Sequence, residues 1–329
     1  MGVKVSGTST HLKALGISMS AAKSWIYQNV GAPSTIFQIC REYSISNQMI
    51  SEILNTGNIN AKVVENFFLG HGLSGEKLDS SIAKSLFTIT DHTDLGVSYF
   101  DRKISVFGVP IYASPGVEGK KILHAASIMA EYLDNDENGL ADNQLVVNSL
   151  VAAEHKLLMW KDEADFQYIN VPTSKIQDLG TDETNPSWHQ TPSNGRFDAA
   201  LEEVLHMITQ VGYGGAYPDV FEEKVGTSVA DAMDIARGGR FIEVPDSYPL
   251  DAWFTYNDKT TSYGEMTTEY IYWAITTNLG AQSARSAEIA SEWKLYTPEM
   301  LQASDKAVME IIGNPTYQIP TTLPDGNYM

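Results

Sequence analysis

The residues of this chain that most clearly could do chemistry lie between Asp134 and Asp142, where oxygen-bearing side chains alternate along the sequence. A Ca²⁺ ion takes roughly six to eight oxygen ligands, and an EF-hand-type loop supplies them from alternate positions around a tight turn. Gly139 stands at the sixth position, where such a loop bends. The donors at positions one, three, five, seven and nine would be Asp134, Asp136, Asn138, the carbonyl of Leu140, and Asp142. The sequence therefore predicts a calcium-binding loop.

The twelfth position of this loop departs from the EF-hand pattern. An EF-hand has a bidentate Glu there, and this chain has Leu145. Either the last oxygens come from elsewhere in the chain, as in dockerin-like loops, or the site is weak and rich in water. The alternative without a metal is an acidic turn between two helices, because Asp, Asn and Gly are also common turn residues.

A second group of candidate ligands lies on the helix that we predict for residues 198–211. Its apolar residues recur at helical spacing and define a buried stripe. Glu202 and His206 are four positions apart, so they lie side by side on the flank of that stripe, with Glu203 one step further round. This is the layout of the zincin helix His-Glu-x-x-His, with Glu in place of the first His. The pattern predicts two metal ligands, Glu202 and His206, and a catalytic base, Glu203.

A third ligand for this metal is expected from Glu269, on an apolar helix predicted for residues 265–279. In gluzincin-like proteins, a Glu on a following helix has this role. Zinc is one candidate ion, but one imidazole and two carboxylates form a hard donor set, so calcium and manganese are candidates as well. His189 could add a further ligand. A di-iron site would need a second Glu-x-x-His, which the sequence lacks.

The same residues also have an interpretation without a metal. Paired Glu residues near the start of a helix favour its dipole, and a lone His on a helix flank is commonly a structural hydrogen-bonding residue. The remaining histidines have no evident partners in the sequence and are expected to be structural or exposed; they are His11, His71, His92, His124 and His155.

The composition is that of an acidic globular protein. Hydrophobic residues make up 43% of the chain and charged ones 19%, which argues against disorder. The 22 Lys and Arg against 41 Asp and Glu give a net charge of −19, so nucleic acid is not an expected partner. No stretch approaches the roughly 18 apolar residues of a membrane span. Cys40 is the only cysteine, which excludes an intrachain disulfide.

The location of the protein is predicted from its calcium loop. The first twenty residues contain no continuous apolar segment, so we expect no standard secretory signal. A degenerate calcium loop would nevertheless be loaded mainly outside cells, where free calcium is far higher than inside. We therefore favour an extracellular or cell-surface location, reached without a recognisable signal peptide.

The chain is expected to contain an N-terminal arm (residues 1–17), a small helical module (18–80) and a larger domain (81–329) that carries both candidate sites. A strand or hairpin is predicted for residues 103–113, a short strand for 166–171 and a loop for 173–196. The predicted fold class is α+β and predominantly helical, with a zincin-like, helix-rich larger domain. Its helices are predicted over residues 122–133, 144–160, 198–211, 228–236, 265–279, 284–293 and 298–312.

From about His124 to the C-terminus, the chain resembles an uncharacterised family that combines an EF-hand or dockerin-like calcium loop with a zincin-like Glu-Glu-x-x-His helix. Four blocks carry the resemblance: the loop of residues 133–142, the helix segment 202–206, the Thr-Glu-Tyr-Ile-Tyr-Trp segment 268–273, and the Leu-Pro-Asp-Gly ending 323–326. Members of the family look secreted and carry a cysteine pair just before the third block. This chain has Thr261 and Glu265 there, so that disulfide is absent.

Two functions follow from these patterns. The first is a calcium-binding, zincin-like metalloprotein that acts as a metal-dependent hydrolase, with peptidase as one candidate activity. The second is a non-catalytic extracellular structural, assembly or adhesive protein that calcium stabilises, with self-assembly or a cell-surface or matrix component as its partner. The distances among Glu202, His206 and Glu269 distinguish the two, because catalysis needs these side chains to converge in a place that solvent reaches.

Overall fold

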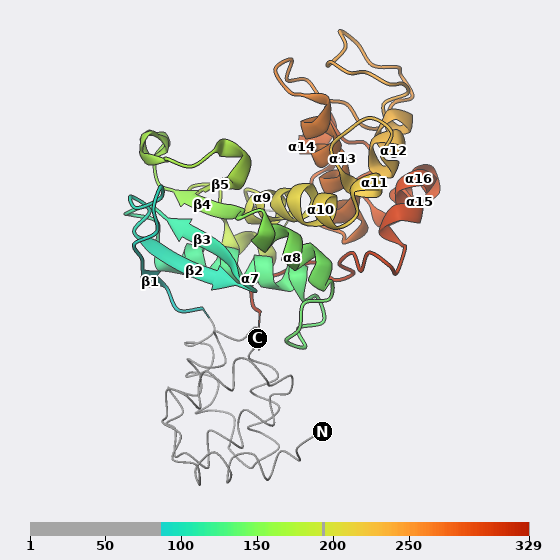
Figure 1. The fold of residues 1–329 in the computed structure, drawn as a ribbon. Coiled ribbons are helices and arrows are strands. Elements are labelled where there is room, and N and C mark those ends of the chain that lie inside the picture. Colours follow the sequence, from blue (N-terminus) through green and yellow to red (C-terminus); the bar gives the residue numbers. More distant parts are fainter. Residues whose placement is uncertain (1–86, 193–194, 329) are drawn as a thin grey trace, which may run out of the picture. The chain divides into compact units, whose positions relative to one another are not determined.

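The computed structural model describes residues 87–192 and 195–328 (Figure 1). The predicted arm and helical module, residues 1–17 and 18–80, lie outside the described residues. By its internal contacts the chain forms two units, one of residues 1–88 with 137–140 and 329, and one of residues 89–136 and 141–328. The second unit contains all the strands and helices described below.

The second unit contains a five-stranded sheet with the strand order β1-β2-β3-β4-β5 (Figure 1). The first three strands pair antiparallel, and β2 and β3 form the predicted hairpin, with Val106 opposite Val109. The strands β3, β4 and β5 are parallel to one another, with Ile111 opposite Leu157 and Leu157 opposite Gln177. The strands are β1 (Thr90–Asp91), β2 (Arg102–Val106), β3 (Val109–Ala113), β4 (Lys156–Trp160) and β5 (Ile176–Gly180).

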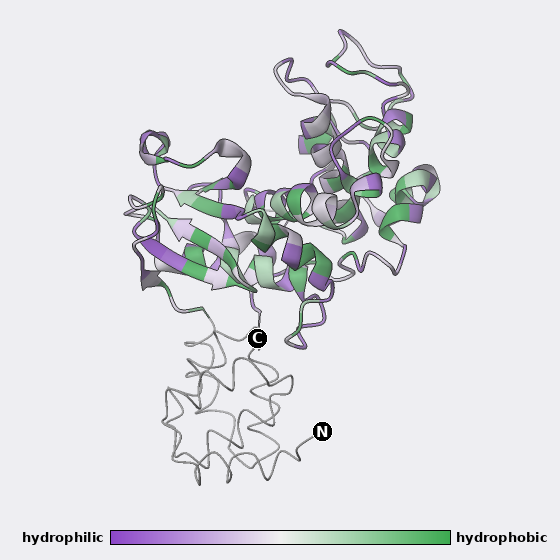
Figure 2. Ribbon diagram, in the orientation of Figure 1, coloured by the Kyte–Doolittle hydropathy of each residue, from purple (hydrophilic) through white to green (hydrophobic). Residues whose placement is uncertain are grey.

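Helices connect and cover these strands. Figure 2 shows apolar residues alternating with hydrophilic ones along most of the helices, as expected for elements with one buried face. The longer helices of the described residues are α7 (Gly119–Leu133), α8 (Gln144–Ala152), α9 (Ala200–Met207), α12 (Ser228–Ala236), α13 (Tyr263–Asn278), α15 (Pro298–Ser304) and α16 (Lys306–Ile312). The short ones are α10 (Gly214–Ala216), α11 (Pro218–Phe221) and α14 (Ser286–Ile289), with 3₁₀ turns η1 (Glu163–Tyr168), η2 (Thr173–Lys175) and η3 (Pro186–Gln190) and a π-helix η4 (Ile208–Tyr213).

Two helices place the candidate sites against the sheet. Helix α7 contacts β2 and β3, α9 contacts β5, and α7 and α9 contact each other. Helix α13 packs against α9 from the side of the molecule where the C-terminal helices gather (Figure 1). The described part of the chain thus combines helices with a mixed sheet, which confirms the α and β content of the predicted fold class.

The single helix predicted for residues 144–160 is wrong. Helix α8 ends at Ala152, and Glu154 has a positive φ of 54°, which turns the chain. The following residues form β4, whose three central side chains are buried. A short, continuously apolar strand cannot be told from a buried helix by its periodicity, which explains the error.

Three further predictions of secondary structure are corrected. Residues 163–168 form the 3₁₀ turn η1, and not the strand predicted for 166–171. The predicted loop 173–196 contains β5, whose sequence Ile-Gln-Asp-Leu-Gly has little strand character. The helix predicted for 298–312 is two helices, because Asp305 ends α15 and its side chain caps α16 by accepting a hydrogen bond from the Val308 N–H.

No helix within residues 87–192 and 195–328 combines the length and the apolar character that crossing a bilayer requires.

Candidate metal centres

Helix α9 carries the predicted metal ligands, and its sequence explains how it is held. Leu201, Val204 and Leu205 are completely buried, so the predicted apolar stripe faces the interior. The acidic residues in the first turn stabilise the positive end of the helix dipole. After Met207 the helix continues as the π-helix η4. Such π segments are rare in proteins, and those that occur are often found at functional sites.

The structure brings Glu202, His206 and Glu269 together. A ligand atom from each of the three lies within 4.8 Å of the others. The imidazole Nε2 of His206 lies 3.6 Å from Oε2 of Glu269, within ion-pair range but beyond hydrogen-bond length. This buried nitrogen has no hydrogen-bond partner among the described residues. The group therefore has the convergent arrangement of a metal site, with distances wider than those of a closed hydrogen-bond network.

Glu269 reaches this group from helix α13. The helix begins with a capping box, in which the Ser262 side chain accepts a hydrogen bond from the Glu265 N–H and the Glu265 side chain accepts one from the Ser262 N–H. The Tyr256 hydroxyl lies 3.3 Å from Oε1 of Glu269 and donates to it. One carboxylate oxygen is thereby held, while the other faces His206.

Glu203, the predicted catalytic base, lies at the edge of this group. Its Oε2 accepts a 2.6 Å hydrogen bond from the Gln177 amide on β5 and is 3.6 Å from Nδ1 of His206. The side chain keeps 23% of its surface exposed, against 9% for His206, so solvent reaches the base. A carboxylate that is oriented, exposed and next to candidate ligands has the placement that proton transfer requires.

Charge and burial set the protonation of the group. Burial alone would lower the pKa of His206, but the neighbouring carboxylates of Glu269 and Glu203 raise that pKa well above its usual range. Burial raises the pKa of Glu202 to about 7, with the positive His206 opposing the shift and Glu203 adding to it. Below about pH 7, two of the three candidate ligands of the metal-free site therefore hold protons with which a cation would compete.

The predicted calcium loop shows a second convergence. Oxygen atoms of Asp134, Asp136 and Asp142 lie within 4.8 Å of one another. Burial raises the pKa of Asp142, whose Oδ2 also accepts a 2.8 Å hydrogen bond from the Asn135 N–H. Asp134 is completely buried at the end of α7. Three carboxylates this close together repel one another unless a cation or bound protons compensate their charge.

Residues 137–140 belong to the other unit and have the local geometry of such a loop. Gly139 has a φ of 102°, at the position where the sequence predicts the bend. The side chain of Asn138 accepts a 3.0 Å hydrogen bond from the Leu140 N–H, which closes an Asx turn. The roles of Asn138 and the Leu140 carbonyl as calcium ligands stay predictions.

The C-terminal tail fastens to the loop and to the end of α7. Oδ1 of Asn135 accepts hydrogen bonds from the backbone N–H groups of Thr321 and Thr322, each 2.8 Å long. The Tyr328 hydroxyl donates to Oδ2 of Asp134 over 2.5 Å. The family-like ending of the chain thus lies beside the predicted calcium ligands, a contact that the sequence alone does not reveal.

A third cluster, formed by His124, His189 and Asp198, was missed by the sequence analysis. Nε2 of His124 lies 2.6 Å and Nε2 of His189 lies 2.8 Å from the same oxygen, Oδ2 of Asp198. The expectation that His124 has no partner is wrong, and His189 lies with Asp198 and not with the Glu202 group. The three residues are far apart in the sequence, and Asp198 reads there as an ordinary helix-start residue, so no local pattern indicates the cluster.

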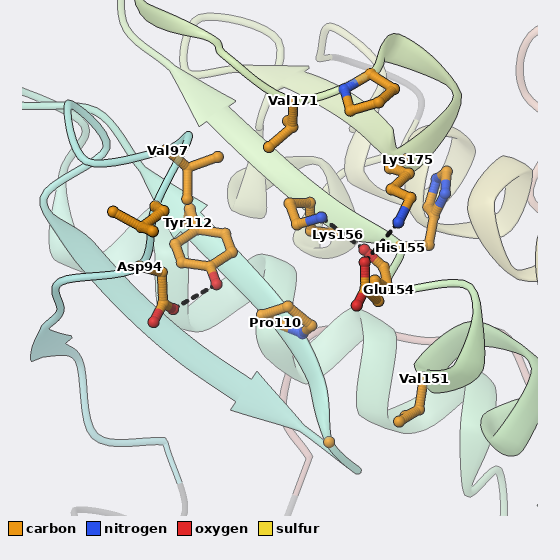
Figure 3. Close-up of a pocket in the computed structure, with 13 residues that line it drawn as sticks. Asp94, Val97, Pro110, Tyr112, Val151, Glu154, His155, Lys156, Val171 and Lys175 are labelled. Atoms are coloured by element: carbon orange, nitrogen blue, oxygen red, sulfur yellow. Dashed lines mark hydrogen bonds and ion pairs between the residues drawn. The ribbon is translucent and has the colours of Figure 1, made fainter.

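The described residues also form a pocket of about 410 Å³ beside β3 and β4 (Figure 3). Tyr112 and Asp94 line one side, where the tyrosine hydroxyl donates to the carboxylate, and Lys175 pairs with Glu154 on another. His155 also lines it and is 2% exposed. None of the predicted site residues lines this pocket.

We compared the chain with models of known protein families, with curated proteins and with solved structures, and none of the three comparisons gave a match. The resemblance stated above therefore rests on its four sequence blocks alone.

Proposed function

We propose that this protein is a metal-dependent hydrolase whose ion is held by Glu202, His206 and Glu269, with Glu203 as the general base. The observation that carries the proposal is the convergence of three ligand atoms from α9 and α13 within 4.8 Å, around a buried His206 Nε2 without a hydrogen-bond partner in the described part of the chain. A divalent ion in this place would polarise a substrate carbonyl and lower the pKa of a bound water molecule.

The protein's own residues would then divide the work. Glu202 and Glu269 supply charge and His206 supplies a nitrogen donor, which suits zinc or manganese. Gln177 orients the Glu203 carboxylate through the 2.6 Å hydrogen bond. With its exposed edge, Glu203 can accept a proton from an attacking water molecule and return it to the leaving group.

The surroundings of the site favour a peptide substrate. Among the described strands, β5 pairs with β4 only, so its other edge has no strand partner, and β5 contacts α9. An extended peptide can add to such an edge through main-chain hydrogen bonds. Burial raises the pKa values of Asp178 and Glu183, and the charge of neighbouring Glu203 adds to both shifts. Three acidic side chains this close favour a substrate with a cationic group, which would offset their mutual repulsion.

Metal analysis combined with an activity assay tests the proposal. The protein, purified without chelator, is measured for bound metal and for hydrolysis of labelled casein, alongside E203Q, E269Q and, as a control, the exposed Glu310→Gln. We expect E269Q to lose one bound transition-metal ion and the activity, E203Q to lose only the activity, and E310Q to keep both. If the wild type binds no metal that E269Q loses, the metal site is overturned. If the metal is bound but hydrolysis does not depend on Glu203, the catalytic role of Glu203 is overturned.

The second candidate function is a structural or assembly protein stabilised by calcium. It is favoured by the contact of the tail with the loop, because Asp134 and Asn135 hold residues at the C-terminal end through hydrogen bonds. Under either function, we propose that calcium binds at the cluster of Asp134, Asp136 and Asp142. We also propose an extracellular location, where such a site would be filled. If a metal is bound through Glu269 but no hydrolysis is measured, the structural or assembly function is favoured over the hydrolase.

A further inference from the structure

The cluster of His124, His189 and Asp198 joins three separate segments of the fold. His124 lies on α7, His189 on η3, and Asp198 directly before α9. The side chains are 6%, 7% and 0% exposed. Both imidazoles direct Nε2 to one carboxylate oxygen, over 2.6 Å and 2.8 Å.

The carboxylate of Asp198 is held from its other side. Its Oδ1 accepts hydrogen bonds from the backbone N–H groups of Asn185, at 2.7 Å, and Ala200, at 3.4 Å. Burial alone would raise the pKa of Asp198, but the hydrogen bonds from His124, His189 and the Asn185 N–H hold it well below its usual range. One oxygen is thereby fixed by the backbone and the other is presented to both imidazoles. Outer partners that orient a ligand in this way are typical of metal sites.

We propose that His124, His189 and Asp198 bind a zinc-class transition-metal ion that is separate from the ion proposed at Glu202. Two imidazole nitrogens and one carboxylate oxygen are a donor set that zinc and similar ions prefer, whereas calcium prefers oxygen alone. Three protein ligands leave a fourth tetrahedral position for water. The inference does not rest on the proposed hydrolase activity.

The present geometry needs only a small adjustment to accept such an ion. Zinc–ligand bonds of roughly 2.0–2.2 Å in a tetrahedron place neighbouring ligand atoms about 3.3 Å apart. The Nε2–Oδ2 distances of 2.6 Å and 2.8 Å would therefore widen by about 0.7 Å and about 0.5 Å. Each imidazole now donates through Nε2–H, so binding moves that proton to Nδ1 and frees the Nε2 lone pair for the ion.

An ion in this place would position helix α9. It would join α7 and η3 to Asp198, whose next turn along the chain begins α9 and leads to Glu202. The backs of both imidazoles are already packed, His124 against Gly326 and His189 against Trp188, whose ring centroid is 5.1 Å away. The role of this ion is therefore positional, because it fixes the start of α9 relative to α7.

The test measures zinc binding in a background from which the other candidate transition-metal site is removed. The full chain carrying E269Q is stripped with chelator, loaded with Zn²⁺ or Co²⁺ and dialysed, alongside E269Q/H189Q and, as a matched control, E269Q/H92Q. In the H189Q variant, the introduced amide can still donate a hydrogen bond to Asp198 but is a poor zinc ligand. We expect one tightly held ion in E269Q and E269Q/H92Q and none in E269Q/H189Q, with cobalt giving the visible absorption of four-coordinate nitrogen and oxygen ligation.

A second measurement keeps the inference testable if H189Q fails to fold. Long-range ¹H–¹⁵N spectra of the wild-type histidines, without and with Zn²⁺, report which ring nitrogen carries the proton. We expect two imidazoles to change from the Nε2–H to the Nδ1–H form. If E269Q holds no ion, if its ion survives H189Q, or if no second imidazole changes tautomer, the cluster is a hydrogen-bond network only and the inference is overturned.

Discussion

Gly326 lies so close to His124 that a Cβ atom at position 326 would fall 2.1 Å from Nδ1 of the imidazole. The glycine also has a φ of 81°, a conformation that other residues adopt only at a cost. Its N–H donates a 3.1 Å hydrogen bond to Oε2 of Glu131 on α7. The C-terminal tail thus depends on a residue without a side chain to pack on the helix that carries His124.

We expect Gly326→Ala to destabilise the fold more than Gly226→Ala. Gly226 has a similar φ of 90°, but a Cβ there would meet no atom within 4 Å. Both substitutions introduce the backbone strain, roughly 1 kcal/mol, and only the first adds a clash in a packed region, worth roughly 1–3 kcal/mol more. Urea unfolding of the two variants measures the difference, and equal midpoints would show that the tail does not pack on His124 in solution.

Calcium is expected to raise the melting temperature, and Asp136→Asn is expected to remove most of that rise. Asp136 is exposed, so its replacement leaves the core intact, and the lost charge weakens a site whose predicted donors are mainly carboxylates. Asp251→Asn, at an exposed position outside the cluster, is the control and should respond to calcium as the wild type does. Melting curves in EGTA and in millimolar calcium decide the matter, and identical curves for the wild type would contradict the calcium site.

The candidate sites that could be predicted from the sequence are those whose residues are close together in the chain. Asp134, Asp136 and Asp142 lie in one turn, and Glu202 and His206 on one helix face, so spacing alone places each set together. The pairing of Glu269 with His206 was predicted from the gluzincin pattern, in which a Glu on a following helix is the third ligand. The cluster at Asp198 needs three segments that meet through packing, and no spacing rule specifies that.

The fold shows the same dependence. The hairpin around residues 103–113 is local, and its alternation predicts it. The strand β5 has weak strand character in its sequence and exists because it pairs with β4, from Lys156 opposite Ile176 to Trp160 opposite Gly180. Tertiary pairing outweighed local preference there, and the prediction of a loop was wrong for that reason.

In the metal-free protein, Glu202 is expected to make stability fall as pH rises. Its pKa in the folded protein is about 7, above the ordinary value of 4.5. Its contribution to the free energy of unfolding is therefore fully present below pH 4.5 and is lost as pH rises through 7. Such a shift corresponds to at most roughly 3 kcal/mol. In EDTA, E202Q should therefore lose less stability than the wild type between pH 5 and pH 8. The exposed Glu310→Gln serves as control, and a wild-type slope in E202Q would show that Glu202 is ionised in the fold.

A bound metal should reverse the effect of the same substitution. The ion needs the ionised carboxylate, so the proton that stabilises the metal-free form is displaced when the ion binds. At pH 8 with saturating zinc or manganese, E202Q should be less stable than the wild type, whereas in EDTA at the same pH we expect it to be the more stable of the two. Thermal melts with and without the ion test this crossover, and a substitution effect of the same sign in both conditions would contradict a role for Glu202 as a ligand.

His155 is expected to make the protein sensitive to acid. Burial lowers its pKa to about 4, and the charge of Lys156 adds to the shift. Both ring nitrogens are buried and lack a well-formed hydrogen bond to any described residue. The pKa in the folded protein lies below the ordinary value of 6.5. The contribution of the neutral ring to the free energy of unfolding is therefore present above pH 6.5 and is lost as pH falls through 4. This contribution is at most roughly 3 kcal/mol.

His155→Leu should remove this acid sensitivity. Leucine fills a similar volume and takes no proton, so the variant should be close to the wild type at pH 7.5 and more stable than it at pH 4.5. His92→Gln is the control, since His92 contacts the Phe100 carbonyl and lies outside this pocket. Urea unfolding from pH 7.5 to pH 4 gives the two slopes. If H155L loses stability as steeply as the wild type, the ring is already protonated or solvated in the folded protein, and the pocket beside β4 opens to water more than the structure indicates.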